Sequence, residues 1–392
     1  MAQTRTITPA KLRKIAALEL ALRPLLALAP RPRRARALPW GPERILLVEP
    51  WGLGDIVLVT PLLAELRERF PGAHVTLLAK PAAQTLLAGS GLADDIITFD
   101  FPWTAHGAKY SPSRYHMGRF ARLFKELRTR AFDLTLDARG DIRGNVVTYL
   151  SGAPRRIGYD SGGGAHLLTD ALPSGPRDAH RIDDWLRLLV PLVGEPPRSR
   201  PPLLRTTEAE RATASRAFRD MGLGLDGGRE VVAIHAGASH PVRRLREEIV
   251  RELAVGLIER GADVLLIVDP DGHGAEFQLP PEVRVLRPEL RQLMATIECV
   301  DLLVCSDSAA MHIAVALGTP VTAVFGPQRH DWYGPRDPRD RAVWVEEMPC
   351  RPCFDACIFA SPLCMDQIGG AQLLAAVTSR LKPGAARVKM TI

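Results

Sequence analysis

Three short polar segments stand directly after apolar, strand-like runs, and each carries side chains that could bind or transfer a charged group. The first is "WGLGD" (51–55), the second is "GASHPVRR" (237–244) and the third is "SDSAAMH" (306–312). In open parallel sheets, ligands bind outside the carboxyl ends of strands and at the N-termini of the helices that follow. These three segments are therefore the candidate site.

The first segment ends in Asp55, which can play either of two roles. Gly52 and Gly54 allow a sharp turn after the apolar run, and an aspartate at the start of the next helix is a good cap. The same carboxylate could instead act as a general base that accepts a proton from an incoming hydroxyl. The sequence leaves both roles open, and the two can coexist.

The second segment has the residue types of a diphosphate site. Gly237, Ala238 and Ser239 are small, so their backbone N–H groups could approach a phosphate closely. Arg243 and Arg244 follow, as a diphosphate clamp would require. The alternative is that both arginines are solvated at a helix start, but there they would oppose the helix dipole, which favours an anionic partner.

The third segment places Ser308 and Ala309 at the start of a helix, whose free N–H groups favour an anion. Asp307 could cap that helix or contact a sugar hydroxyl. His312 lies about one turn further on, where a lone histidine is usually a hydrogen-bonded core residue. These loops hold no glycine-rich dinucleotide fingerprint, no P-loop and no Asp-x-Asp pair of the kind that binds a nucleotide-bound metal.

Four of the six cysteines are crowded together in the pattern C-x2-C-x3-C-x6-C. Because no export signal is recognised, we expect a reducing compartment, where disulfides are not the first interpretation. Structural zinc or iron at Cys350, Cys353, Cys357 and Cys364 is a candidate, although the spacing is tighter than in the common two-pair zinc patterns.

The elements that must position these residues alternate between strand and helix along the chain. The strand-like runs are RILLVEP (44–50), HVTLLAK (74–80), FDLTLDARG (132–140), EVVAIHAG (230–237), ADVLLIVDP (262–270), DLLVCSD (301–307) and PVTAVFG (320–326). Helical patterns separate most of them, and the Pro- and Arg-rich stretch at 194–204 is typical of a linker. The alternation predicts an α/β protein with parallel sheets in two halves.

Charge and composition narrow the function classes. The chain has 392 residues, enough for two domains, and its 6% aromatic content does not indicate a nucleic-acid stacking surface. No apolar run approaches the ~20 residues that span a bilayer. The formal net charge is +7. Residues 1–44 have a net charge of +8 and the remainder −1, so we expect no nucleic-acid partner.

The N-terminal 43 residues form a basic arm in this interpretation. Leu12, Ile15, Leu18 and Leu22 recur at roughly helical spacing, and an arginine cluster follows them. A basic amphipathic helix of this kind suits an anionic membrane surface. A helix packed on its own protein, followed by a solvated linker, explains the pattern equally well.

Three blocks of the sequence together resemble a known family. They are "ILLVEPWGLGDIVLVTPLLAELRERFPGAHVTLLAKP", "VVAIHAGASHPVRR" and "CSDSAAMHIAVALGTPVTAVFGP". In order and spacing they are similar, across roughly residues 44–380, to glycosyltransferase family 9, which includes the ADP-heptose:lipopolysaccharide heptosyltransferases. The cluster "CRPCFDACIFASPLC" also resembles one found after the third block in many members.

The resemblance implies a GT-B fold, with two Rossmann-like parallel-sheet domains facing across a cleft. It implies an acceptor-binding domain at 44–200 and a sugar-nucleotide-binding domain at 201–368 that contains the cysteine cluster. Residues 369–392 are then a C-terminal helix and tail, which we expect to pack back on the N-terminal domain. The arm at 1–43 precedes these domains.

The resemblance also implies an inverting, metal-independent transfer of a heptose from ADP-heptose to a lipopolysaccharide-core or similar acceptor hydroxyl, on a lipid-linked, lipopolysaccharide or other glycan acceptor. Asp55 is then the general base. The donor site comprises Gly54, Gly237, Ala238, Ser239, Arg243, Arg244, Asp307, Ser308, Ala309 and His312, with Glu276 at the ribose and Asp271 as the second choice. No cofactor is required, and the expected location is the cytoplasm, at the inner face of the cytoplasmic membrane.

The sequence departs from the family pattern at three places. The family commonly has Lys where Arg243 stands, Trp-Pro where Leu245 and Arg246 stand, and Gly where Ala309 stands. Charge and anion binding survive these changes, but the donor could differ. The alternatives are therefore a GT-B transferase that uses another nucleotide sugar for a surface glycan, protein or secondary metabolite, and a non-catalytic sugar-nucleotide or metal-binding protein.

Overall fold

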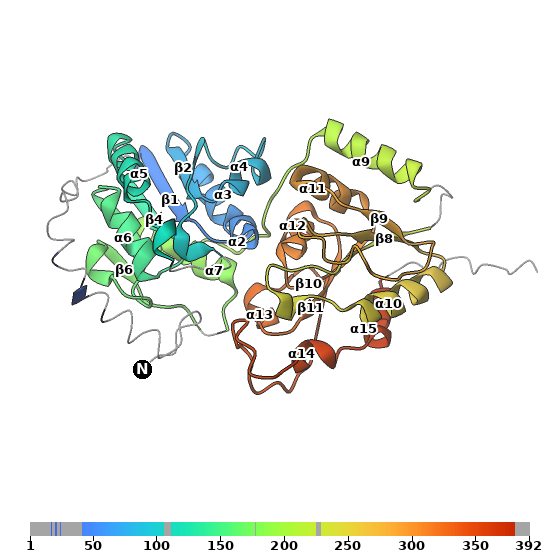
Figure 1. Ribbon diagram of the computed structural model, residues 1–392. Coiled ribbons are helices and arrows are strands. Elements are labelled where there is room, and N and C mark those ends of the chain that lie inside the picture. The colour runs from blue at the N-terminus through green and yellow to red at the C-terminus, as the bar shows by residue number, and fades with distance from the viewer. Residues whose placement is uncertain are drawn as a thin grey trace, which may run out of the picture. The chain divides into compact units, whose positions relative to one another are not determined.

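The computed structural model describes residues 41–105, 111–176, 178–224 and 229–380, together with positions 17, 20, 21 and 24. The chain divides into two compact units, Met1–Arg200 and Pro201–Ile392 (Figure 1). The predicted amphipathic helix of the basic arm lies almost entirely outside the described residues. Each unit is an α/β sandwich in its own right and is described by itself.

The first unit is built on six parallel strands with helices on their faces (Figure 1). Its strands are β1 (Arg44–Glu49), β2 (His74–Ala79), β3 (Asp95–Thr98), β4 (Leu134–Asp137), β5 (Arg155–Tyr159) and β6 (Asp170–Leu172). Its helices are α2 (Leu53–Leu58), α3 (Thr60–Arg69), α4 (Ala82–Leu86), α5 (Met117–Thr129), α6 (Ile142–Leu150), α7 (Arg181–Leu186) and α8 (Val190–Val193). Short 3-10 turns are η1 (Pro102–Thr104), η2 (Pro112–Arg114), η3 (Ala165–Leu167) and η4 (Arg187–Leu189).

The second unit repeats this plan with another six-stranded parallel sheet. Its strands are β7 (Val231–His235), β8 (Asp263–Ile267), β9 (Arg284–Leu286), β10 (Leu302–Ser306), β11 (Val321–Phe325) and β12 (Arg341–Trp344). Its helices are α9 (Glu208–Asp220), α10 (Glu247–Glu259), α11 (Leu290–Cys299), α12 (Ala309–Leu317), α13 (His330–Tyr333), α14 (Leu363–Asp366) and α15 (Gly370–Thr378), with a 3-10 turn η5 (Pro241–Arg243).

The strand order is the same in both sheets. It is β3-β2-β1-β4-β5-β6 in the first unit and β9-β8-β7-β10-β11-β12 in the second, so each unit has the doubly wound order 3-2-1-4-5-6. In this order the chain reverses its direction of winding between the first and fourth strands. The switch points therefore lie between β1 and β4 and between β7 and β10, which pair in parallel.

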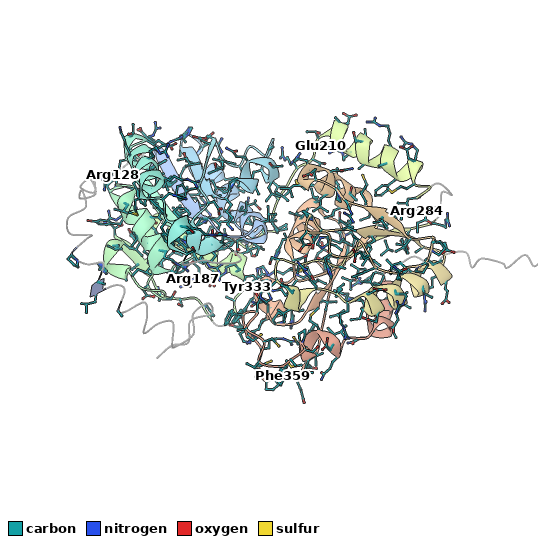
Figure 2. The ribbon with its side chains drawn as sticks, viewed as in Figure 1. Arg128, Arg187, Glu210, Arg284, Tyr333 and Phe359 are labelled. Carbon is teal, nitrogen blue, oxygen red and sulfur yellow. The ribbon has the colours of Figure 1, made fainter. Side chains whose placement is uncertain are left out.

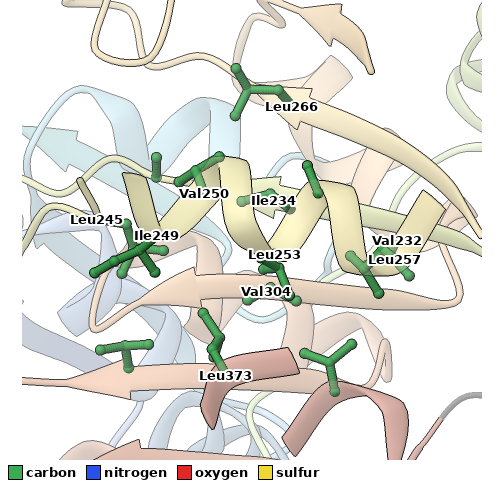
Figure 3. Packing of buried hydrophobic residues seen from close by; sticks show 14 of the residues in the cluster. Val232, Ile234, Leu245, Ile249, Val250, Leu253, Leu257, Leu266, Val304 and Leu373 are labelled. Atoms are coloured by element: carbon green, nitrogen blue, oxygen red, sulfur yellow. The ribbon is translucent and has the colours of Figure 1, made fainter. Parts of the chain in front are cut away.

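Continuous apolar strands and an amphipathic helix explain the core of the second unit. The strands β7, β8, β10 and β11 are buried along their whole length, as expected when helices cover both faces of a parallel sheet. Figure 3 shows α10 laying its apolar stripe over this sheet. Ile249, Val250, Leu253 and Leu257 of that stripe are each at most 5% exposed. Burial of such side chains contributes ~1.5–3 kcal/mol each.

The helix α15 packs in the second unit, whereas the sequence led us to expect packing on the N-terminal domain. Its buried residues Leu373 and Val377 belong to the core beneath α10, and α10 and α15 lie side by side in Figure 1. The contact is close because Gly256 of α10 has no side chain. A Cβ there would lie 2.2 Å from Cδ2 of Leu374.

Candidate active site

The predicted site residues lie at the two switch points. In the first unit, Asp55 follows β1, and the register of β1 and β4 pairs Val48 with Asp137 at their carboxyl ends. In the second unit, the small-residue turn follows β7, and Asp307 follows β10. Each unit thus gathers its polar segments where a doubly wound sheet binds ligands.

Asp55 caps a helix and also meets a cation. It is the third residue of α2, and its Oδ2 accepts a hydrogen bond from the N–H of Gly52, the N-cap residue, at 3.1 Å. Its Oδ1 accepts from Nη1 of Arg139 at 3.1 Å, and the Asp55 side chain remains 23% exposed. Both oxygens are therefore oriented, while the carboxylate stays accessible to a substrate.

Gly52 and Gly54 do not form the sharp turn that the sequence predicted. Gly52 has extended backbone angles, φ −76° and ψ 168°, and Gly54 lies inside α2. Neither residue adopts the left-handed conformation that requires glycine. The site residue Gly54 therefore contributes backbone in the first turn of α2.

Arg139 is held by an aromatic ring as well as by Asp55. Its guanidinium carbon lies 4.6 Å from the ring centroid of Trp51, and that of Arg143 lies 5.1 Å from the same ring. Both are within the range of favourable cation–π attraction. Arg143 also pairs with Asp141, whose carboxylate caps the N-terminus of α6. The indole therefore gathers two arginines beside Asp55.

Two carboxyl groups are fully buried beneath this cluster. Burial and the Asp141 carboxylate raise the pKa of Asp137 to about 7, although Oδ2 accepts from Gly140 N–H at 2.7 Å. Burial, followed by the nearby Asp55, raises the pKa of Glu49 well above its ordinary value. Glu49 and Asp137 end neighbouring strands, so the first switch point combines the partly exposed Asp55 carboxylate with two buried acids.

The turn after β7 in the second unit is shaped by the partly buried carboxylate of Asp269. A Cβ on Gly237 would lie 1.4 Å from Oδ2 of Asp269, the residue two beyond the end of β8. Oδ1 of Asp269 contacts Nε2 of the buried His235 at 2.8 Å, and Oγ of Ser306 donates to the Gly237 carbonyl at 2.9 Å. Glycine is therefore required by contact with Asp269. Ala238 is buried and Ser239 is exposed.

Arg243 is clamped between two carboxylates. Its Nε and Nη2 each donate to Asp355 at 2.6 Å, and its Nη1 donates to Asp307 at 3.1 Å. Burial alone would lower the pKa of Arg243, but Asp307 and Asp355 outweigh it and raise that pKa. Among the described residues, these contacts occupy three of the five N–H donors of the guanidinium, so two remain that a ligand could accept from.

Arg244 does not share the partners of Arg243. It pairs with Asp271, and its Nε donates to the Ala238 carbonyl at 3.3 Å. Both arginines precede α10, which begins at Glu247, so the dipole argument made from the sequence does not apply to them. Glu276, the predicted ribose ligand, is exposed, and its carbonyl accepts from Gln278.

Helix α12 begins at the second switch point without a side-chain cap. Ser308 is its N-cap residue, yet its Oγ is buried and has no partner among the described residues. Ala309 is the first helical residue and is half-buried, while His312 is 7% exposed inside the helix. The Ser308 side chain therefore does not cap α12. The first N–H groups of α12 lie beside a bare hydroxyl, an arrangement that favours an anion.

A further unpartnered amide lies at the end of the next strand. Gln328 follows β11, is 6% exposed, and its Oε1 has no hydrogen-bond partner in the part of the chain that the structure describes. A buried polar atom without a partner costs ~1–3 kcal/mol. Ser308 and Gln328 therefore mark this edge of the sheet as a place where a polar ligand would recover lost hydrogen bonds.

The cysteine cluster is not a metal centre in this structure. No group of three or more His, Cys, Asp or Glu side chains that could hold a metal ion occurs in residues 229–380 or in the other described ranges. Cys364 is buried on α14 beneath β11, whereas Cys357 is exposed. The predicted zinc or iron site at Cys350, Cys353, Cys357 and Cys364 is therefore unsupported.

Arginine hydrogen bonds fix the cysteine loop instead. Arg351 donates from Nε to the Gly326 carbonyl at 2.8 Å and from Nη1 to the Val345 carbonyl at 2.7 Å. Phe359 lies at the outer edge of the second unit (Figure 2) and is 41% exposed. Phe354 and Asp355 both have left-handed backbone angles, φ 54° and 67°. This bend brings Asp355 to Arg243, so the loop forms part of the site.

Sequence reasoning missed several residues of both clusters. Arg139 and Asp137 had a weak signal, since they follow a strand that ends in polar residues. Glu49 was hidden inside an apolar run. Asp355 had no signal, because its contact joins residues 112 positions apart.

Two doubly wound units, each with polar groups at its switch point, are the architecture of the GT-B fold. The solved structures agree with this fold. A glycosyltransferase family 9 protein from Veillonella parvula matches with a TM-score of 0.68 and 20% identity, covering 86% of this chain and 97% of that chain. E. coli ADP-heptose LPS heptosyltransferase II matches with a TM-score of 0.67 and 21% identity, covering 86% and 98%.

The sequence comparisons then give the family. The chain belongs to glycosyltransferase family 9 (heptosyltransferase), whose model matches residues 120–361. Lipopolysaccharide heptosyltransferase 2 of Escherichia coli K12 is 23% identical over 320 residues, which cover 76% of this chain and 87% of that protein. The predicted family, enzyme class and fold are confirmed. Within the described residues, no helix is both long enough and apolar enough to cross a membrane.

Proposed function

We propose that this enzyme transfers a heptose from ADP-heptose to a hydroxyl of a lipopolysaccharide-core acceptor, with inversion and without a catalytic metal. Its relatives support this substrate pair, because the E. coli proteins are named as an ADP-heptose LPS heptosyltransferase and a lipopolysaccharide heptosyltransferase. The observation that carries the proposal is the bare Ser308 hydroxyl at the uncapped start of α12, next to Asp307 and Arg243.

The second unit supplies the donor site in this proposal. The diphosphate lies at the N-terminus of α12, where the first N–H groups and the Ser308 hydroxyl donate to its oxygens. The two spare N–H donors of Arg243 neutralise the charge that develops on the leaving phosphate. Gly237, Ala238 and Ser239 present backbone to the ligand, and Arg244 adds positive charge. In this proposal His312 of α12 contacts the donor sugar, and the exposed Glu276 contacts the ribose.

The first unit supplies the base. Asp55 accepts the proton of the acceptor hydroxyl while the oxygen of that hydroxyl attacks the anomeric carbon. The bond from that carbon to the diphosphate oxygen breaks on the opposite face, and ADP leaves with the electron pair. Gly52 N–H and Arg139 hold both Asp55 oxygens in place, so little reorganisation is needed at the moment of transfer.

Calorimetry with ADP, UDP and GDP, followed by a donor screen, tests the donor assignment. ADP should bind, and Ser308→Ala should weaken it. Asp55→Asn should leave ADP binding unchanged and reduce transfer by about 100-fold or more, since general bases contribute ~10²–10⁴. Asp100→Asn is the control, because Asp100 is an exposed carboxylate of the same unit outside the site. Preference for UDP or GDP would refute the heptose donor.

One observation favours a second candidate, a GT-B transferase that uses another nucleotide sugar. Ala309 places a methyl group at the first residue of α12, beside the proposed diphosphate. The donor screen separates the two functions, because an Ala309→Gly variant should improve heptose transfer only if that methyl restricts the donor sugar.

The basic segment at 1–44 supports association with an anionic membrane that carries the acceptor. Peripheral binding at the inner face of the cytoplasmic membrane is the location that we propose on this basis. Sedimentation with anionic and neutral vesicles, compared for the full chain and for a form with the arginines of 31–36 replaced by Gln, tests it.

A further inference from the structure

Glu49, the last residue of β1, has a buried carboxyl group, and only one of its two oxygens is hydrogen-bonded among the described residues. Glu49 is 0% exposed. Its Oε1 accepts from the N–H of Trp51 at 3.2 Å, and its Oε2 is buried without a partner among the described residues. An ionised carboxylate in this position would be strongly disfavoured, since a buried charge needs both a partner and hydrogen bonds.

Glu49 is part of a closed chain of contacts that includes the proposed base. Its carboxyl holds the N–H of Trp51, and the Trp51 ring lies 4.6 Å from the Arg139 guanidinium. Arg139 donates to Oδ1 of Asp55 at 3.1 Å, and Oδ2 of Asp55 accepts from Gly52, the residue after Trp51. The carboxyl groups of Glu49 and Asp55 therefore accept hydrogen bonds from the adjacent N–H groups of Trp51 and Gly52. Arg139 contacts both the Trp51 ring and Asp55, and so links the two parts of the turn.

We propose that Glu49 is a positioning residue for Asp55. In its un-ionised form, the Glu49 carboxyl holds the turn between β1 and α2. When Glu49 ionises, it draws Arg139 away from Asp55, the proposed base. The inference rests on the proposed function, in which Asp55 accepts the proton. It assigns a role to a residue that does not touch the substrate and acts through Trp51 and Arg139.

The charges around Glu49 determine the direction of the effect. Burial is the largest cause that raises its pKa, and Asp55 on α2 and Asp137 on β4 raise it further, whereas Arg139 lowers it. When Glu49 ionises, Arg139 faces two carboxylates and is shared between them. Asp55 then loses part of its fixed orientation, and the cluster gains a negative charge. Acceptor use should therefore fall as the pH rises, while donor binding by the second unit stays constant.

Steady-state kinetics from about pH 6 to about pH 10 on the full chain test the proposal. Wild type should show an alkaline fall in kcat/KM for the acceptor. Glu49→Gln keeps an acceptor for the Trp51 N–H but cannot ionise, so that fall should disappear. Glu49→Ala leaves the turn unheld and should lower kcat/KM about tenfold to a hundredfold at every pH. Glu195→Gln, an exposed neutral substitution in the same unit, should match wild type.

An infrared measurement gives a readout that does not need activity. The band of an un-ionised carboxyl should be present near neutral pH in wild type and weaker by one group in Glu49→Gln. A Glu49→Gln enzyme with the wild-type alkaline fall, or with an unchanged infrared band, overturns the inference. If Asp55→Asn transfers normally, the proposed base is wrong, and that result is distinct from either outcome at Glu49.

Discussion

Replacing Asp137 with Asn should change how the stability of the first unit depends on pH. Asp137 is fully buried at the end of β4, and its carboxyl packs so closely against α6 that a Cβ on Gly144 would lie 2.3 Å from Oδ1. Asparagine has nearly the same shape and retains a carbonyl acceptor for the Gly140 N–H. It cannot ionise, so it removes the titration while preserving the packing.

The size of the effect follows from the shifted pKa. Burial and Asp141 raise the pKa of Asp137 from 3.8 to about 7. Because the folded pKa is the higher one, the folded state binds the proton more tightly, and its stability falls as the pH rises from about 4 to about 7. At about 1.4 kcal/mol per unit, the full loss is about 4 kcal/mol, of which about 2–3 kcal/mol falls between pH 5 and pH 8.

Hydrogen exchange in urea, followed in peptides that cover β4 and α6, measures this loss for the first unit alone. That choice avoids a single unfolding free energy for a chain of two units. Wild type should lose about 2–3 kcal/mol of unfolding free energy between pH 5 and pH 8, and Asp137→Asn should not, so the variant gains that amount relative to wild type over this range. The exposed Asp100→Asn variant should show the same pH dependence of stability as wild type. A difference between Asp137→Asn and wild type that is constant with pH would refute the assignment of a buried, neutral acid.

Three further substitutions test the packing and the donor site. Gly237→Ala places a Cβ 1.4 Å from Oδ2 of Asp269. It should destabilise the second unit by about 3 kcal/mol in thermal or urea unfolding. The control is Gly72→Ala, which should be neutral because there is open space around Gly72. Gly256→Ala should cost about 1–3 kcal/mol by pushing Leu374 and α15 off α10, and a Gly256→Ala/Leu374→Ala double variant should recover part of that loss; no recovery would contradict the contact. Ser308→Ala should not destabilise the free protein, because the Ser308 Oγ has no hydrogen-bond partner among the residues that the structure describes. The substitution should weaken ADP binding about tenfold to a hundredfold by calorimetry, and unchanged affinity would contradict the anion site.

The buried, mostly apolar strands were predictable from the sequence, and the edge strands were not. β1, β7 and β10 each contain a run of four or more largely apolar residues, because these residues are buried on both faces of the sheet. β6 and β9 have three residues each, and they are partly exposed, so they carry no comparable pattern. The α/β class and the parallel sheets follow from the alternation of these buried strands with helical patterns.

The candidate site was predictable to the extent that it follows strand ends. Asp55, Arg243 and Ser308 lie in the segments that follow recognisable strands, so their positions near the switch points follow from topology. Their partners do not. Asp355 reaches Arg243 through a loop bend at φ 67°, and Trp51 collects Arg139 through a ring contact, neither of which is encoded in local sequence. The metal interpretation of the cysteines stays unsupported for the same reason, because spacing alone does not direct side chains to one point.

The cysteine loop offers a natural attachment point for a spectroscopic probe. Of the six thiols, Cys357 is the exposed one, while Cys305 and Cys364 are buried and the other three are intermediate. It lies two residues from Asp355, so a dye coupled there would sit beside the carboxylate that clamps Arg243. If the sugar nucleotide takes over contacts of Arg243, the dye should report it as a change in emission. Donor binding could then be timed in a stopped-flow instrument with native cysteines and no engineered label site.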